Sequence, residues 1–102
     1  MVKSGVWKPT SGEPAKKLAG SCEVTNLSLK SGGGAGVVSF YDGVAAEDVK
    51  DANLRWVLDA STQDADSDTF PGLIFNTGIY AVCEQGINFN PIVCIAAKKY
   101  TP

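Results

Sequence analysis

The fold of this chain is decided by the stretch Val37-Val38-Ser39-Phe40-Tyr41-Asp42-Gly43. β-Branched and aromatic residues fill most of its first five positions, and such side chains suit the pleated, half-buried surface of a strand. The Asp-Gly pair that follows is the strongest short turn signal in the sequence. We therefore expect a β-strand that ends at a turn, with Phe40 on one face and Tyr41 on the other.

Further strand signals lie on both sides of this stretch. Residues 22–30 alternate between apolar and polar side chains, but the phase slips by one residue midway, which predicts a β-bulge or a bend. Residues 44–60 fit helical spacing and, from Leu54 onward, strand alternation; since no helix stop signal follows, we expect a loop or short helical turn to about Ala52 and then a strand. The other predicted strands and extended pieces cover residues 70–75, 79–83, 87–89 and 92–100.

Short strands separated by Gly, Asn and Asp are typical of an all-β sandwich or small barrel. We expect residues 21–102 to form a single domain, a small antiparallel β-sandwich that is jelly-roll-like or a small barrel. Alternation within the strands also predicts which side chains form the core. The predicted core residues are Val24, Leu27, Val38, Phe40, Leu54, Trp56, Leu58, Ile79, Ala81, Cys83, Ile92 and Cys94.

Residues 1–20 are expected to form an extended N-terminal arm outside this domain. Prolines and glycines interrupt any periodicity there, and four lysines oppose one glutamate. We expect it to act as an anchor or as an inter-subunit arm. A buried Trp7 would hold the contact, and the lysines would set association rate and salt sensitivity. The predicted interface residues are Val6, Trp7, Lys3, Lys8, Lys16 and Lys17.

The composition excludes several kinds of chemistry. The 102 residues contain no histidine, which excludes Ser-His-Asp and Cys-His nucleophiles and mixed Cys/His zinc sites. A net charge of −2 argues against non-specific nucleic-acid binding, which needs a basic face. No pair of carboxylates is singled out by its spacing for acid/base catalysis. We expect no enzymatic activity, no cofactor and no nucleic-acid partner.

Two loops match known ligand-binding motifs only in part. The acidic stretch 59–69 contains Asp-Ala-Asp-Ser-Asp, which copies the start of a calcium loop, but Thr69 stands where that loop needs glycine and Phe75 where it needs glutamate. We expect a solvated loop there, and an unrelated cation site stays open. The glycine run 32–36 lacks the Lys-Ser/Thr of a phosphate loop and is expected to be a mobile connection.

Targeting signals and cysteines bear on the compartment. The N-terminal residues contain no apolar run of signal-peptide length, and no stretch is long enough to span a membrane. We therefore expect the chain to fold in the cytoplasm, without a membrane partner. The three cysteines are predicted to be reduced, although a Cys83–Cys94 disulfide between neighbouring strands stays open.

Charge is unevenly distributed along the chain. Residues 42–68 hold eight carboxylates against Lys50 and Arg55, whereas the rest of the chain carries a net positive charge. Such segregation could orient identical subunits or dock a basic arm on an acidic partner. A fortuitous scatter of solubilising charge is the alternative.

The chain resembles small bacteriophage virion proteins in three blocks. These are residues 36–43 with the strand ending Tyr-Asp-Gly, residues 54–58, and residues 70–82 with the element Pro-Gly-Leu-Ile-Phe-Asn-Thr-Gly-Ile-Tyr-Ala-Val. The resemblance covers roughly residues 22–100, and the acidic insert between Leu58 and Phe70 departs from it. It implies a compact β-sandwich on the outside of a capsid, as a decoration (cement) or head-fibre protein often grouped in threes. It supplies no catalytic residues.

We therefore expect a non-enzymatic structural protein of a tailed-phage virion, which folds in the cytoplasm of the bacterial host. It would decorate or cement the capsid as a homo-oligomer, most simply a homotrimer, with the major capsid protein as its partner. The alternative is a carbohydrate- or receptor-binding β-sandwich that uses exposed aromatic side chains such as Trp56 or Tyr80. A small enzyme is the third hypothesis.

Overall fold

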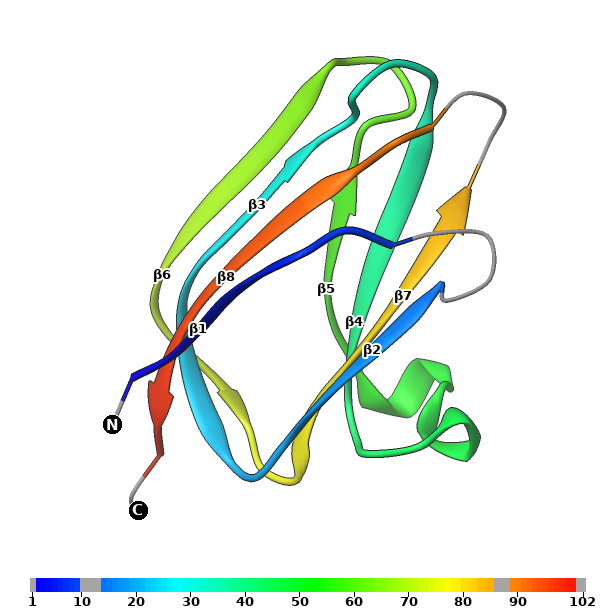
Figure 1. Ribbon diagram of the computed structural model, residues 1–102. Coiled ribbons are helices and arrows are strands. Elements are labelled where there is room, and N and C mark those ends of the chain that lie inside the picture. The colour runs from blue at the N-terminus through cyan, green and yellow to red at the C-terminus, as the bar shows by residue number, and fades with distance from the viewer. Residues whose placement is uncertain (1, 10–13, 86–88, 101–102) are drawn as a thin grey trace.

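The computed structural model describes residues 2–9, 14–85 and 89–100 (Figure 1). These residues form eight β-strands and two single-turn 3-10 helices. In chain order the elements are β1 (Val2–Trp7), β2 (Ala15–Ala19), β3 (Cys22–Lys30), β4 (Gly36–Asp42), η1 (Ala46–Asp48), η2 (Asp51–Asn53), β5 (Leu54–Asp59), β6 (Ala65–Phe75), β7 (Gly78–Gln85) and β8 (Ile92–Lys99). Among the described residues, no helix has the length and apolar character to cross a membrane.

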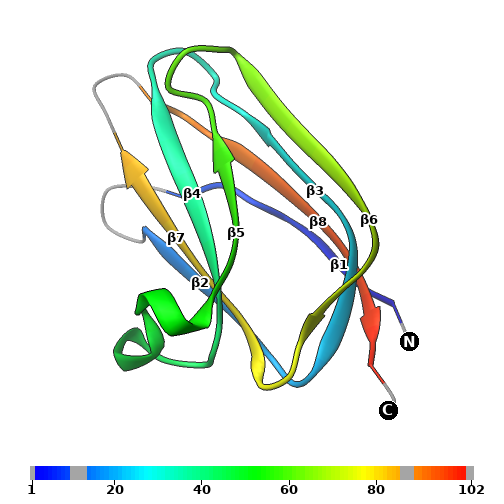
Figure 2. The same cartoon turned by 180° about the vertical axis from the view of Figure 1, so that it is seen from behind.

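The strands build two four-stranded antiparallel sheets that face each other (Figures 1 and 2). Sheet A has the order β1-β8-β3-β6, and sheet B has the order β2-β7-β4-β5. The first strand pairs with the last, the second with the seventh, the third with the sixth and the fourth with the fifth. The chain is thus one long double ribbon wrapped into a sandwich, which is the topology of a jelly roll. The predicted all-β sandwich is confirmed.

The N-terminal segment differs from the arm expected over residues 1–20. It is extended, but β1 pairs with β8 along sheet A and β2 pairs with β7 along sheet B. Both are therefore edge strands of the sandwich. The sandwich begins with β1 at residue 2 and not at residue 21 as expected. Pairing with a distant strand supplies the hydrogen bonds that this polar segment could not form alone.

The bulge predicted within residues 22–30 is confirmed. The register of β3 shifts between Val24 and Asn26 against both of its neighbours, β6 and β8. The Thr25 hydroxyl donates a hydrogen bond of 3.2 Å to the Ala96 carbonyl. The short helical turns expected before residue 54 are also present, as η1 and η2.

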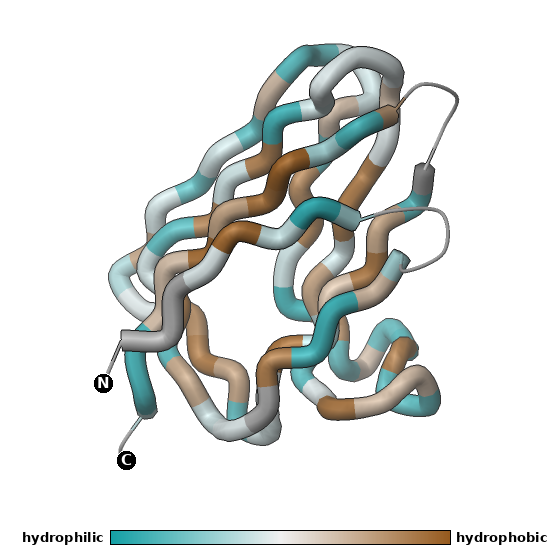
Figure 3. The backbone as a smooth tube through the Cα atoms, in the orientation of Figure 1, coloured by the Kyte–Doolittle hydropathy of each residue, from teal (hydrophilic) through white to brown (hydrophobic). Residues whose placement is uncertain are grey.

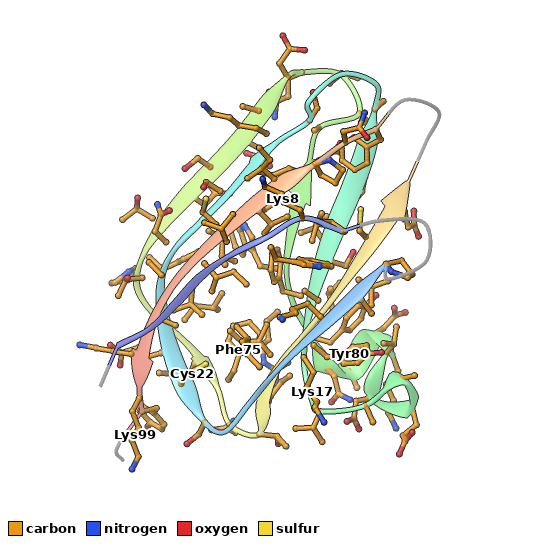
Figure 4. All side chains as sticks on the ribbon, in the orientation of Figure 1. Lys8, Lys17, Cys22, Phe75, Tyr80 and Lys99 are labelled. Atoms are coloured by element: carbon orange, nitrogen blue, oxygen red, sulfur yellow. The ribbon has the colours of Figure 1, made fainter. Side chains whose placement is uncertain are left out.

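The core lies between the two sheets and confirms most of the predicted set. Figure 3 shows the apolar positions along the facing strands, and Figure 4 shows Phe75 in the space between the sheets. Eight predicted residues are buried: Val24, Leu27, Val38, Phe40, Leu58, Ile79, Ala81 and Cys83. Buried residues that alternation did not select include Trp7, Cys22, Leu29, Phe75, Val93 and Ile95.

Four predicted core residues are not buried, for two reasons. Ile92 is exposed and Cys94 only half-buried, because β8 turns Val93, Ile95 and Ala97 inward instead. This strand is apolar in both phases, so alternation could not choose between them. On the edge strand β5, a register shift after Phe40 places Leu54 opposite Tyr41 on the outer face, and Trp56 is half-buried at the rim.

The three cysteines are free thiols. Cys83 lies on β7 in sheet B and Cys94 on β8 in sheet A, so they are not on neighbouring strands. The disulfide left open by the sequence is not formed.

Within the acidic stretch 59–69, only residues 60–64 form a loop. The loop prediction is wrong for Asp59, which ends β5, and for residues 65–69. From Ala65 the chain enters β6, which pairs with β3 at residues 65–69 and 73–75. Cross-strand hydrogen bonds to β3 outweigh the weak strand preference of Asp and Ser. Pro71 is tolerated because β6 is an edge strand.

Candidate functional site

The outer face of sheet B is the most distinctive surface of the molecule. On β4, Val38 and Phe40 are fully buried, so the alternate residues Ser39 and Tyr41 face outward. On β7, the buried Ala81 and Cys83 place Tyr80 and Val82 outward in the same way. Figure 4 shows Tyr80 on the side of sheet B away from Phe75. The outward positions are thus mostly aromatic or aliphatic, where a solvated sheet face would carry polar side chains.

The outward residues line up in rows across the sheet. Tyr41 lies directly opposite Tyr80 on one side and Leu54 on the other. In the next row, Ser39 lies between Val82 and Val57. Directly opposite side chains on a sheet are about 5 Å apart, so these residues form one continuous surface. We call it the tyrosine face and define it as Tyr41, Leu54, Val57, Tyr80 and Val82.

The described chain covers the tyrosine face only in part. Leu54 is 37% and Val57 39% exposed, and the two tyrosines and Val82 are partly exposed. Contiguous apolar surface of this kind marks sites of interaction with other molecules. Tyrosine is particularly common at such sites because its ring is apolar and its hydroxyl tolerates water.

Charges of opposite sign border this face. Lys17 on β2 is exposed and lies opposite Tyr80, at one corner. Asp59 on β5 is exposed and lies opposite Val37, at the diagonal corner. Hydrogen bonds from the Ser61 side chain and backbone N–H lower the pKa of Asp59, which keeps this carboxylate ionised. A partner of the tyrosine face therefore meets an apolar centre with charged corners, the usual anatomy of a protein interface.

The six predicted interface residues do not gather in one place. Trp7 is only 9% exposed and packs in the core of its own chain, a different role from the inter-subunit anchor expected of it. Val6, its neighbour, is 65% exposed on the outer face of sheet A. Lys8 and Lys16 are exposed, and Lys17 borders the tyrosine face. The side chain of Lys3 lies outside the described part of the chain.

The acidic residues 42–68 include a structural site, at Asp42, that the sequence pattern does not reveal. The buried Asp42 carboxylate accepts hydrogen bonds from the backbone N–H groups of Asn76 (3.0 Å), Thr77 (2.8 Å) and Gly78 (3.4 Å). Its Oδ2 also lies 3.4 Å from Nη2 of Arg55. Asp42 therefore ties the end of β4 to the β6–β7 turn. The Asp-Gly pair in the sequence indicates only a local turn, because the hydrogen-bond partners of Asp42 lie more than thirty residues away.

Two more carboxylates, on β6, accept hydrogen bonds from β5 across the edge of the sandwich. The Asp59 backbone N–H donates to Oδ2 of Asp66 (2.9 Å), and Nε1 of Trp56 donates to Oδ2 of Asp68 (2.9 Å). The rings of Trp56 and Phe70 meet edge to face with centroids 4.8 Å apart. These acids thus connect the two sheets. Across the described residues, no three His, Cys, Asp or Glu side chains gather as a metal site would require.

Comparison with known proteins adds no relative: no protein-family model and no curated protein matches this chain.

Proposed function

We propose that this protein is a non-enzymatic structural component of a phage particle, and that it decorates the capsid by binding other subunits through the tyrosine face. The observation that carries the proposal is the row Tyr80-Tyr41-Leu54 on the outer face of sheet B. Covering these exposed apolar side chains with a partner is favourable by about 25 cal/mol for each Å² of surface that is buried.

The size of the face bears on how such binding would work. The whole outer face of sheet B, of which the tyrosine face is a part, has four strands of five to eight residues. With strands about 4.8 Å apart and about 21 Å long on average, its flat area is about 400 Å². A stable interface buries about 800 Å² on each partner. A single contact through this face is therefore weak, and several linked contacts would multiply its strength. This favours attachment as a homo-oligomer, and we propose a homotrimer.

The topology supports the same proposal by analogy. Jelly rolls recur in viral capsid proteins and in lectins, although a fold by itself does not determine a function. The capsid surface is the setting implied by the resemblance of residues 36–43, 54–58 and 70–82 to phage virion proteins.

Binding to purified particles tests the proposal. The untagged protein is mixed with particles that lack it, and the bound fraction is measured by sedimentation. We expect Tyr80→Ala to weaken binding about tenfold or more, because half-buried tyrosines are frequent energetic centres of interfaces. Thr69→Ala, on the outer face of sheet A, is the matched control and should bind like the parent. Equal binding by Tyr80→Ala and the parent would refute the role of this face.

A second candidate function is carbohydrate binding, and the adjacent Tyr41 and Tyr80 favour it, since flat aromatic rings stack on sugars. Trp56 contributes less to such a platform, because its ring is half-buried and its Nε1 is bound to Asp68. A glycan array on which the parent gives a hit and Tyr80→Ala does not would favour this candidate. An array without hits would exclude the sugars it carries.

A further inference from the structure

One end of the sandwich carries a groove centred on Ile92. Two neighbouring hollows of about 270 and 480 Å³ share this residue, which is 37% exposed. The smaller is lined by Lys8, Pro9 and Pro91, and the larger by Lys30 and the glycines of the β3–β4 connection. We call this surface, Lys8, Pro9, Lys30, Pro91 and Ile92, the Ile92 groove.

Backbone hydrogen bonds join the chain segments around the groove. The Ser31 N–H donates to the Asp64 carbonyl (2.8 Å), and the Asn90 N–H donates to the Ser31 carbonyl (3.1 Å). Gly32 has a φ of +63°, and a Cβ there would lie 2.1 Å from the Asn90 carbonyl oxygen. Three separate connections therefore meet at close contact, and the groove is preformed.

The groove has an apolar centre between positive charges. Lys30 lies directly opposite Ile92 across the β3–β8 pair, and Lys8 lines the hollow on the other side. Both lysines are exposed, and neither forms an ion pair with any residue that the structure describes. Asp64 also lines the larger hollow, so the groove keeps a net positive charge of one. Such a site fits an apolar side chain flanked by carboxylates.

The same chain presents that pattern at its other end. Between η1 and η2, Val49 is 37% exposed, and Glu47 and Asp51 on either side of it are exposed too. The loop has a fixed shape: Oδ2 of Asp48 accepts hydrogen bonds from the N–H groups of Val44 (2.8 Å) and Ala45 (3.1 Å). Even with Lys50 counted, residues 46–51 carry a net negative charge. Figure 1 shows this η1–η2 loop at the opposite end of the sandwich from the β3–β4 connection.

We propose that the Ile92 groove of one copy receives the η1–η2 loop of a second copy, with Val49 against Ile92 and Glu47 and Asp51 against Lys8 and Lys30. Because groove and loop lie at opposite ends of one chain, the contact is head-to-tail and leaves both copies able to bind another. Such contacts produce closed rings or open rows. The contact deepens the proposed function and rests on it for its setting, an array of subunits on a particle.

Charge reversal of the full-length chain tests the contact, with self-association measured by sedimentation equilibrium up to about 1 mM. The groove variant carries Lys8→Glu and Lys30→Glu, and the loop variant carries Glu47→Lys and Asp51→Lys. Each alone should raise the self-association Kd at least tenfold, since like charges then face each other. All four substitutions together should restore it to within about threefold of the parent, which also shows that the variants fold.

Two observations would overturn the contact. One is a parent that stays monomeric up to 1 mM, and the other is a four-substitution protein that associates no better than the groove variant. Lys99→Glu, a charge reversal remote from the groove, is the matched control and should associate like the parent. The self-association experiment contains no capsid, so a negative result there does not bear on particle binding through the tyrosine face. Conversely, a negative result in the particle-binding experiment does not bear on the contact between the Ile92 groove and the η1–η2 loop.

Discussion

Replacing Asp42 by alanine should destabilise the fold more than replacing any exposed carboxylate. The Asp42 side chain is the sole acceptor that the described residues offer to the N–H groups of Asn76 and Thr77. It is buried, with 7% of its side chain exposed, so water cannot readily take its place. Removing it leaves backbone donors unpaired at the β6–β7 turn, 34 and 35 residues away in the sequence.

The magnitude follows from the individual bonds. A hydrogen bond to a charged group contributes about 1.5–3 kcal/mol, and the bonds of 2.8 and 3.0 Å are of normal length. The 3.4 Å contacts to Gly78 and to Arg55 are long, and Arg55 is partly exposed, so together they add at most about 1 kcal/mol. We expect Asp42→Ala to lower the free energy of unfolding by about 3–7 kcal/mol. For a domain of this size the Tm should fall by about 12 °C or more.

Chemical denaturation followed by tryptophan fluorescence measures this loss. Asp51→Ala is the control: Asp51 is exposed, and its side chain accepts no hydrogen bond from any described residue, so the change should stay within about 0.5 kcal/mol. Asp42→Asn keeps one acceptor oxygen and should lie between the two. If Asp42→Ala loses less than 1 kcal/mol, the tie between β4 and the β6–β7 turn does not stabilise the fold as argued.

Three further predictions concern the core and the thiols. Phe40→Ala should cost about 3–5 kcal/mol in a denaturant titration, since Phe40 is fully buried; an unchanged midpoint would contradict its place in the core. Labelling of freshly made, unfolded protein should find three free thiols, and a single thiol would reveal a disulfide. Burial, with a smaller contribution from Glu84, raises the pKa of the Cys83 thiol from 9.0 to about 11. The folded chain thus holds this proton more tightly than the unfolded chain, so stability is full below pH 9 and falls between pH 9 and 11. The fall should be steeper than in Cys83→Ala, and equal slopes would contradict the shift.

The strands of the central part could be predicted because local pattern and tertiary structure agree there. In β3 and β4 the buried phase is the apolar phase, and even the bulge near Thr25 leaves a trace in the alternation. Where both phases are apolar, as in β8, the neighbouring strands decide which side chains turn inward, and no local pattern reports that decision.

The parts that could not be predicted depend on distant partners. In sequence, β1 contains Gly5, and Pro9, Gly12 and Pro14 lie between it and β2, so no strand pattern stands out. The two segments become strands because β8 and β7 offer them unpaired edges. The role of Asp42 depends on a turn that only the completed fold brings close. The tyrosine face could be anticipated only in part: alternation places Tyr41 opposite in phase to Phe40, but its alignment with Tyr80 and Leu54 is a property of the sheet register.

The most direct test of the proposed function is quantitative mass spectrometry of purified phage particles from cells that carry this gene. The account predicts many copies of the protein per particle, in a fixed ratio to the major capsid protein. It also predicts that a chromosomal Tyr80→Ala substitution, with the protein still folded and abundant in the lysate, lowers that ratio. Particles that contain none of the protein, while the lysate contains it in soluble form, would contradict the account.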